Sequence, residues 1–394
     1  MSDDLSPLEN ESIALDLGEH AEKKKAIHNL SGAAFVGEHL YLANDEGTHL
    51  LRVKRDAPQR YAACESLRIA DLFKLQDGEI DSKEFDLEAL AIDTHDNKIV
   101  RLWLIGSHAM GHEAPPGTDL KHLGLKRGRN RLLFGCVSVD ARGGLIDSTG
   151  RHLRIKPIGE TWTTHFLSAL RQASPMANGF VHEASALTQQ TVPDALAQRV
   201  GWFTPYTMAS TKENGLDVEG LAIRRRDGDR ATAVALVGLR GPVIDGLAVL
   251  IEVDIRDHNK RALRLTAGPR FHLLDLCGFG IRDLEWRGDD LLILAGPTMT
   301  RQRESALFRW NDAWTKIARG GETVVEVSDI EHIGSLPMPE EKSGPEVLTT
   351  ITAQQPEYML LRDGIGKHRL RDQAGNASAL GPVYHTEVYR IADR

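Results

Sequence analysis

Short apolar runs separated by polar turns fill most of the chain, and one such run recurs. Residues 85–92 (FDLEALAI) return as residues 216–223 (LDVEGLAI), with weaker echoes at 281–286 (IRDLEW) and 344–348 (GPEVL). Each copy has the length of a β-strand and sets a carboxylate among apolar residues. A run that recurs along a chain is typical of a fold built from repeated units.

Further strand-like runs follow each copy in the same order, and the pattern predicts five units. The predicted strands of successive units are 30–36, 40–44, 48–54 and 66–73; 85–93, 99–105, 131–139 and 151–157; 216–223, 233–238, 248–255 and 270–276; 280–286, 291–294, 306–310 and 323–330; and 344–348, 358–361 and 384–391. The fifth unit has one strand too few, while residues 11–18 form an isolated strand-like run. We therefore expect the N-terminal strand to complete the last unit, which is how a β-propeller closes.

The sequence thus predicts an all-β fold, with residues 1–394 forming a single five-bladed β-propeller domain. Residues 1–10 are polar and are expected to be mobile. Residues 163–200 break the pattern with helix-like spacing and are expected to form a helical insertion. A β-sandwich also has many short strands, but it does not predict five restarts with a spare strand at the far end. A further degenerate blade within residues 125–211 is the alternative to a count of five.

Composition narrows the class of protein. With 41% hydrophobic and 26% charged residues, the chain has ample material for a core, and its net charge of -8 disfavours non-specific nucleic-acid binding. The N-terminus lacks the pattern of a signal peptide, and no apolar run approaches the roughly 20 residues that cross a bilayer. Cys64, Cys136 and Cys277 form no CxxC motif. We expect a cytoplasmic protein without a nucleic-acid or membrane partner.

The recurring carboxylate suggests a site on the propeller axis, because the first strand of each blade lines the axis. Aligning the five restarts places one side chain from each unit at an equivalent position: Ser31, Glu88, Glu219, Asp283 and Glu346. Like charges that converge raise one another's pKa. A bound cation relieves this repulsion, and carboxylate oxygens suit Ca²⁺ or Mg²⁺. The four acids are therefore candidate ligands of a divalent cation.

Other interpretations of the same acids remain open. Arg282 adjoins Asp283, and Arg240 ends a second strand, so arginines could tie the acids into an internal network between blades. The acids could also be solvated in the channel, or could accept hydrogen bonds from backbone N–H groups of the adjacent blade.

The ends of the second strands are expected to surround the mouth of the channel, and several carry polar or charged residues. These are Asp45, Glu46, Ser107, His108, Arg240, Arg362 and Asp363. Polar groups that converge on a concave mouth are the default location of a site. His108 is a candidate general base or metal ligand, although a histidine here could equally be a hydrogen-bonding rim residue. The two arginines could grip an anion or form salt bridges with the neighbouring acids.

Several of these segments together resemble a known family. FDLEALA, GLDVEGLAI, GLRGPV, GFGIRDLEW and ILAGP resemble a family of bacterial proteins of unknown function predicted to be β-propellers, from about residue 30 to residue 391. The element D-[LV]-E-[GA]-L-A is also similar to the blade motif of phytase-like and esterase-like propellers. That second resemblance implies axial acids that hold calcium and a channel mouth that binds phosphoester or lactone substrates. The first family has no known catalytic residues to transfer.

These observations lead to two hypotheses. In the first, the protein is a metal-assisted hydrolase of a small phosphorylated or ester substrate, with Glu88, Glu219, Asp283 and Glu346 holding the cation. His108 would transfer protons, Arg240 and Arg362 would orient the anionic substrate, and Asp45 would join them at the mouth. In the second, the protein is a non-catalytic scaffold that binds a protein partner through its rim or its helical insertion.

Overall fold

The computed structural model is all-β, with a few short helices. It describes residues 5–7, 12–18, 29–75, 84–94, 99–113, 124–146, 150–158, 161–172, 203–207, 209–226, 228–298, 304–320, 323–337, 344–351, 357–362 and 383–391.

Antiparallel sheets of four strands repeat along the chain. In order from the inner strand outward they are β3 (Leu30–Val36), β4 (His39–Asn44), β5 (His49–Ala57) and β6 (Arg60–Arg68); β7 (Leu87–Thr94), β8 (Ile99–Gly106), β11 (Phe134–Asp140) and β12 (Arg151–Leu153); β15 (Asp217–Arg226), β16 (Asp229–Ile244), β17 (Leu247–Asp257) and β19 (Arg270–Asp275); β20 (Gly280–Arg287), β21 (Asp290–Gly296), β22 (Glu304–Trp310) and β24 (Ile330–Pro337); and β25 (Pro345–Thr350), β26 (Glu357–Arg362), β28 (Glu387–Ile391) and β1 (Leu5–Pro7).

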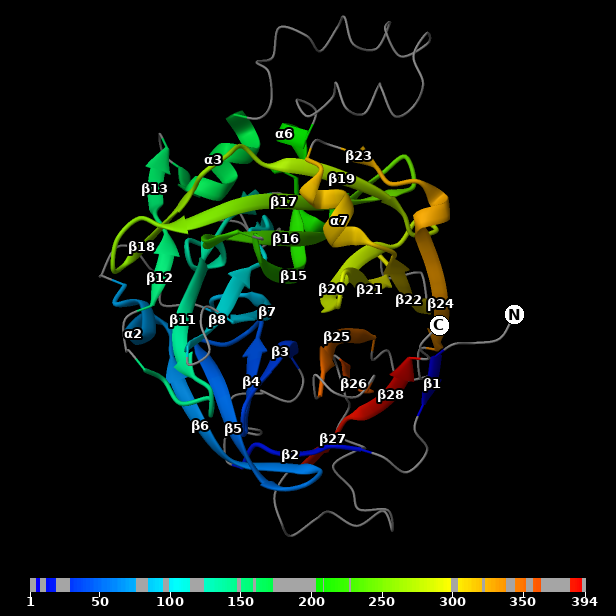
Figure 1. The fold of residues 1–394 in the computed structure, drawn as a ribbon. Helices are drawn as coiled ribbons and strands as arrows, with labels where there is room; N and C mark the ends of the chain where they lie inside the picture. Colours follow the sequence, from blue (N-terminus) through cyan, green and yellow to red (C-terminus); the bar gives the residue numbers. More distant parts are fainter. Residues whose placement is uncertain are drawn as a thin grey trace, which may run out of the picture.

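The inner strands form a closed ring around a central axis. Strand β3 contacts β7, β7 contacts β15, β15 contacts β20, β20 contacts β25, and β25 returns to contact β3. Figure 1 looks along this axis, with the inner strands nearest the centre and the outer strands at the periphery. The arrangement is propeller-like, and it brings residues far apart in the sequence to one central place.

Closure of the ring differs in one detail from the prediction. The strand that completes the last sheet is β1, which pairs with β28 so that Leu5 lies opposite Ile391. Strand β2 (Ala14–Asp16) instead pairs with the outer strand β6 and with β27 (Val383–His385). The expectation that residues 11–18 complete the last unit was therefore wrong. Residues 5–7 form a strand within the stretch expected to be mobile, and the rest of residues 1–10 lies outside the described residues.

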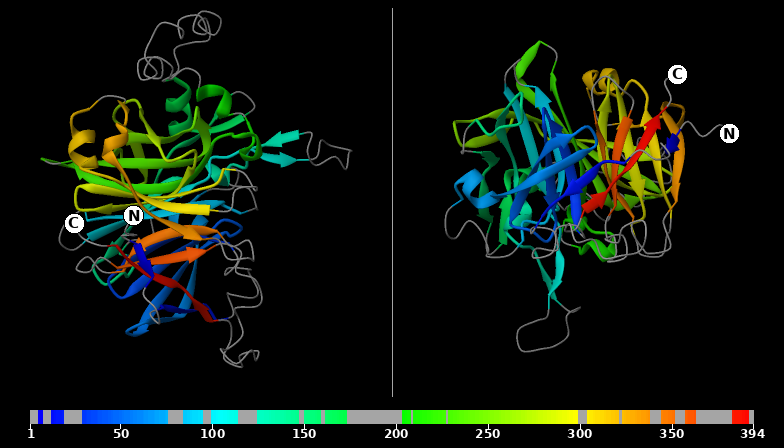
Figure 2. Two further views of the ribbon diagram at one scale, coloured as in Figure 1. Left: turned by 90° about the vertical axis from the view of Figure 1, so that its right-hand side faces the viewer. Right: turned by 90° about the horizontal axis from the view of Figure 1, so that it is seen from below.

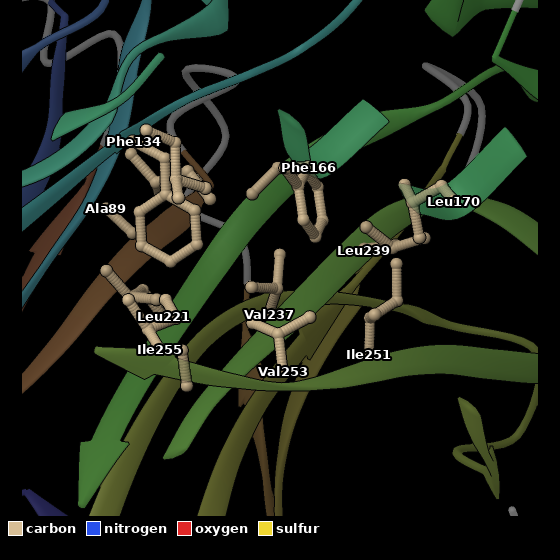
Figure 3. Packing of buried hydrophobic residues seen from close by; sticks show 14 of the residues in the cluster. Ala89, Phe134, Phe166, Leu170, Leu221, Val237, Leu239, Ile251, Val253 and Ile255 are labelled. Carbon is tan, nitrogen blue, oxygen red and sulfur yellow. The ribbon is translucent and has the colours of Figure 1, made fainter. Parts of the chain in front are cut away.

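Apolar side chains fill the interfaces between neighbouring sheets. Figure 3 shows one such cluster, in which Ala89 and Phe134 of one sheet face Leu221 and Val237 of the next. Similar clusters pair Tyr41 with Leu104, Leu236 with Ile293, Leu294 with Leu360, and Leu40 with Met359 across the other interfaces. Each fully buried large apolar side chain stabilises the fold by about 1.5–3 kcal/mol. Packing of this kind is the main contact between neighbouring sheets, and single hydrogen bonds between inner strands, such as the one from Leu348 N–H to Asp283, add to it.

The remaining elements lie outside the ring. They are β9 (Gly111–Glu113), β10 (Gly124–Lys126), β13 (Ile155–Ile158), β14 (Thr161–Thr164), β18 (Ala262–Leu265), β23 (Thr323–Val324), α2 (Ile69–Phe73), α3 (His165–Gln172), α6 (Phe203–Tyr206), α7 (Ala313–Ala318) and the 3₁₀ turns η2 (Asn130–Leu132), η4 (Thr211–Glu213) and η5 (Val327–Asp329). The β9–β10 hairpin projects from one face of the molecule (Figure 2). None of the helices within the described ranges is long and apolar enough to span a membrane.

Two outer strands and the insertion also differ from prediction. Residues 66–73 were expected to be a strand, but the strand ends at Arg68 and helix α2 follows. The outer strand of the fourth unit is β24, which begins where the predicted strand 323–330 ends. In the predicted insertion, α3 begins after Thr164, whose hydroxyl accepts a hydrogen bond from the Leu167 N–H at 3.1 Å. Residues 173–200 of that insertion lie outside the described residues.

Candidate functional site

Each inner strand carries a β-bulge close to its start. The pairing with the neighbouring strand skips one residue in each case, and the skipped residues are Ser31, Glu88, Glu219, Arg282 and Glu346. A bulge bends the strand and turns one side chain out of the regular alternation. All five of these side chains line a single cavity at the centre of the ring.

The cavity has a volume of about 200 Å³ and is bordered by charged side chains from several sheets. Besides the bulge residues, its charged or polar lining consists of Asn29, Asp45, Asp86, Arg131, Thr211, Asp217 and Arg240. Of the residues predicted for the site, the fold brings together Asp45, Glu88, Glu219, Arg240 and Glu346. Asp283, His108 and Arg362 do not line the cavity.

Two arginines hold three of the cavity's acids. Arg240 contacts Asp217 through Nη2 at 2.7 Å and Glu219 through Nη1 at 2.6 Å. Arg282 places Nη1 2.9 Å from Glu219 Oε2 and 2.5 Å from Glu346 Oε2. Arg240 thus joins two carboxylates of β15, and Arg282, itself on β20, joins a carboxylate of β15 to one of β25. This is the arginine network that the sequence left open as an alternative to a metal site, and it involves two of the four predicted metal ligands.

In the second sheet, which begins with β7, Asp86 is bound by a serine and an arginine. Asp86 accepts a short hydrogen bond from the Ser107 hydroxyl, and its Oδ2 lies 3.2 Å from Arg131 Nη1. The backbone of Asp86 has a φ of +51°, in the left-handed region that non-glycine residues seldom adopt. Burial raises the pKa of Asp86, while Arg131 and Ser107 act to lower it. Two residues further on, Glu88 is the bulge residue of this strand.

Glu88 is the acid of the cavity that lacks a cation. Among the described residues its carboxyl group makes no hydrogen bond or ion pair, and it is partly exposed. Burial raises the pKa of Glu88 well above that of an ordinary carboxyl group, and the nearby carboxylates of Asp86, Glu219, Asp217 and Asp45 raise it further.

Asp217 is a buried carboxyl group whose pKa lies near neutral pH. It is 4% exposed, and burial raises its pKa to about 7, with Glu219 and Asp86 acting in the same direction. The positive charge of Arg240 at 2.7 Å opposes this rise and keeps it from going further. A carboxyl group with a pKa near neutrality can both take up and release a proton under physiological conditions.

Asp283 has a structural role instead of the predicted place in the ring. It follows the bulge residue Arg282, so its side chain points away from the axis. Its Oδ2 accepts a hydrogen bond from the Leu348 N–H of the next sheet at 2.8 Å, and its Oδ1 accepts one from the Leu284 N–H at 2.8 Å. The alternative in which a first-strand acid binds the backbone of the adjacent blade therefore applies to this residue. Its equivalent on the axis is Arg282.

His108 and Arg362 are also displaced from the predicted mouth. His108 is fully buried against the Phe166 ring, with ring centroids 5.2 Å apart. Burial lowers the pKa of His108 to about 3, with a further contribution from Arg127, so the imidazole is neutral at physiological pH. Arg362 is 3% exposed and forms a bidentate pair with Glu387 at 2.8 and 3.0 Å. Neither residue is placed to act on a molecule in the cavity.

The acids of the ring do not fit the predicted divalent-cation site. Glu219 and Glu346 are bound by arginine, Asp283 is bound by backbone N–H groups, and only Glu88 of the four has no such partner. In the described part of the chain, no group of three or more His, Cys, Asp or Glu side chains is arranged to hold a metal ion.

Three functional residues escaped the sequence-based reasoning. Asp86, Asp217 and Arg131 line the cavity but were not singled out. Asp86 and Asp217 each stand two residues before an axial glutamate, in DLE and DVE. That shared spacing was the available signal. Arg131 lies outside the repeated run, and only the folded chain brings it to Asp86.

Several solved structures superimpose weakly on this chain. The arabinanase Arb43A of Bacillus subtilis has 10% sequence identity and a TM-score of 0.40, and the match covers 92% of this chain and 93% of that one. The GH32 beta-fructofuranosidase BmSUC1 of Bombyx mori has 8% identity and a TM-score of 0.35, with coverage of 92% and 58%. Similarity at this level says nothing about the activity of this chain. No curated protein sequence matches it.

One protein family does match, over residues 29–378. The matched region begins just before the first inner strand and ends within the last unit of the ring. It confirms the expected relation to a family of unknown function, whereas the similarity to phytase-like and esterase-like propellers stays a prediction. Because the match spans most of the chain, the protein belongs to the family described as "Protein of unknown function (DUF3616)".

Proposed function

We propose that this protein is a five-bladed propeller whose axial cavity is the active site of a small-molecule hydrolase. In this proposal Asp217 is the general base. It removes a proton from a water molecule as the water oxygen attacks the carbonyl carbon of an ester. The bond between that carbon and the alkoxy oxygen then breaks, and Asp217 returns the proton to the leaving oxygen, which gives the carboxylic acid and the alcohol and regenerates the base. The supporting observation is that Asp217 lines the cavity with a pKa raised to about 7.

The neighbours of Asp217 suit this role. Arg240 holds its carboxyl group in one orientation, and Glu219 fixes Arg240 from the other side at 2.6 Å. A base that is held in place loses little entropy when it reacts. Arg240 also stabilises the ionised form, which is the form that accepts the proton.

The charges of the cavity favour an ester over a phosphoester. Six acids line it, Asp45, Asp86, Glu88, Asp217, Glu219 and Glu346, against three arginines, Arg131, Arg240 and Arg282. All three arginines are engaged by carboxylates, so no guanidinium group is left to receive a phosphate. An anionic substrate would therefore meet net repulsion, which argues against the small anionic substrate expected from the sequence.

The test is hydrolysis of a panel of small chromogenic esters and phosphoesters by the wild type and by Asp217→Asn. We expect ester turnover that rises with pH through about 7 in the wild type. Asp217→Asn should lose at least about 100-fold in rate, the usual contribution of a general base. Asp245→Asn, an exposed turn residue, is the matched control and should retain full activity. Equal rates in Asp217→Asn and the control would refute the proposal.

The scaffold hypothesis has no comparable support in the described ranges. Their exposed large apolar side chains are Ile92, Leu125, Ile146 and Val327, on four different segments. Apolar side chains that are exposed singly are normal on a soluble protein and do not mark a docking surface.

A further inference from the structure

We propose that the ligand of the axial cavity carries a cationic nitrogen and that this nitrogen pairs with Glu88. The inference rests on the proposed function only in taking the cavity as the ligand site. It does not require that the bound molecule be hydrolysed.

Comparison of the second and third sheets supports this inference. Both contain the same pattern, Asp86-Leu87-Glu88 and Asp217-Val218-Glu219, with the glutamate on the bulge. In each, the residue before the bulge lies opposite a second-strand residue, Gly106 or Leu239. The next residues along those second strands are therefore equivalent, and they are Ser107 and Arg240.

This difference, a serine in the second sheet and an arginine in the third, determines whether both acids of a sheet have a cationic partner. Arg240 reaches both acids of its sheet, at 2.7 and 2.6 Å. Ser107 reaches only Asp86, through a neutral hydroxyl, and Arg131 also stops at Asp86 and Glu84. Glu88 thus occupies the place of Glu219 without the cation that Glu219 has.

Two further observations show that some carboxylate oxygens of this cavity receive no hydrogen bond from the described chain. Glu88 makes no hydrogen bond or ion pair with any described residue. Glu219 is 5% exposed, and its Oε2 receives no hydrogen bond within the described chain, although it lies 2.9 Å from Arg282 Nη1. A buried acceptor without a donor costs roughly 1–3 kcal/mol. A donor-rich cationic group on a ligand would recover this energy.

An organic cation fits this position better than a metal ion or an anion. A divalent metal ion needs several oxygen ligands around it, which for calcium lie at about 2.3–2.6 Å. The described acids form no such group. An ammonium group needs one carboxylate and space, and about 200 Å³ accommodates a small molecule beside Glu88. Asp45, Asp86, Asp217 and Glu219 act on Glu88 with negative charge, and Arg240 acts on it with positive charge. The acids outnumber the arginine, so the local field attracts a cation.

Binding should also displace a proton. In the free cavity, burial and four neighbouring acids raise the pKa of Glu88, so they disfavour its ionised form. A ligand cation stabilises the carboxylate, so the proton leaves as the ion pair forms. Binding should consequently become tighter as the pH rises.

The test uses four probes in isothermal titration: butylammonium, butanol, butyrate and calcium chloride. The first three each have four carbon atoms and carry a cationic, a neutral and an anionic head group respectively. We expect binding of butylammonium alone, with proton release seen as an enthalpy that depends on the buffer. Glu88→Gln should weaken this binding at least about 10-fold, since an ion pair worth about 1.4 kcal/mol corresponds to that factor. Glu326→Gln, at an exposed position, is the matched control and should bind as the wild type does.

Other outcomes would overturn the inference. Equal binding of butanol and butylammonium would show that charge plays no part. Unchanged butylammonium binding in Glu88→Gln would place the cation elsewhere, and calcium binding that this variant abolishes would assign a metal to Glu88. Asp217→Asn separates this inference from the proposed function, because it should abolish hydrolysis but weaken butylammonium binding less than Glu88→Gln does, since Asp217 contributes only to the field around the ion pair. If the wild type binds the cation but does not turn over any ester, the inference about Glu88 holds and the proposed hydrolase function is refuted.

Discussion

Arg282 and Glu219 are bulge residues of adjacent inner strands, and they meet at the axis with Nη1 2.9 Å from Oε2. The same nitrogen lies 2.5 Å from Glu346 on the next strand. One guanidinium group therefore joins three inner strands of the ring. Its positive charge also lies between two acids of the cavity, so it contributes to both the fold and the site.

Removing Arg282 should destabilise the protein strongly. Arg282→Leu leaves Glu219 and Glu346 without their shared cation, and breaking a buried ion pair in this way costs about 3–5 kcal/mol. We expect that loss in the free energy of unfolding measured with urea. Arg319→Leu, at an exposed position after α7, is the control and should change stability by less than about 0.5 kcal/mol. Similar values for the two variants would show that the axial network contributes nothing.

Asp283 should prove structural and not functional. Asp283→Asn can still accept one of the two backbone hydrogen bonds, from Leu284 or Leu348, but turns an N–H group toward the other donor. The expected loss is about 1–3 kcal/mol in urea unfolding, with butylammonium binding unchanged. If Asp283→Asn has normal stability but impaired ligand binding, Asp283 belongs to the axial site after all.

Because of Glu88, the free energy of unfolding of the wild type should fall as the pH rises. The pKa of Glu88 is raised in the fold, so above the unfolded value of about 4.3 the folded state holds a proton that the unfolded state has lost. Stability then falls with rising pH, by about 1.4 kcal/mol per unit for one proton, until the folded pKa is reached. Unfolding midpoints between pH 5 and 8 should decline less steeply in Glu88→Gln, which resembles the protonated acid. An equal slope in both proteins contradicts this expectation.

His108 should destabilise the fold in acid. Its pKa is lowered to about 3, so the neutral ring is favoured in the fold, and stability is fully present above the unfolded value of about 6.5. Stability should be lost as the pH falls from there toward 3. His108→Phe removes two ring nitrogens that have no hydrogen-bond partner among the described residues, so it should reduce this acid sensitivity and leave activity intact. Loss of ester hydrolysis in a folded His108→Phe protein would restore the predicted catalytic role.

The sequence predicted inner strands better than outer ones, for a physical reason. Inner strands such as β3 and β15 are mostly buried and contain clear apolar runs. The outer strand β6 is largely exposed along its length, so its pattern is weak and its position was misjudged. Inner strands also carry the repeat, from which Glu88, Glu219 and Glu346 were predicted to converge on the axis, and these three side chains line the cavity.

Asp283 was predicted to face the axis, but the axial position is one residue earlier, at Arg282. This error shows a limit of predicting side-chain direction from sequence. In a strand, successive side chains point to opposite faces, so a shift of one position exchanges axis and core. The bulge sets this shift, and it falls on Arg282 in the fourth unit although the carboxylate of the motif is the next residue. His108 and Arg362 were misplaced for a similar reason, because the position of a strand's end does not specify which way its side chains point.

The pKa of Asp217 is the quantity on which the proposed function depends most directly. It can be measured by following the side-chain carboxyl ¹³C resonances of labelled aspartate against pH, with Asp217→Asn assigning the signal. The expected result is a resonance that titrates near 7 in the wild type and is missing from the variant. An Asp217 resonance that titrates near the ordinary aspartate value of about 3.9 would contradict its role as the base of this cavity.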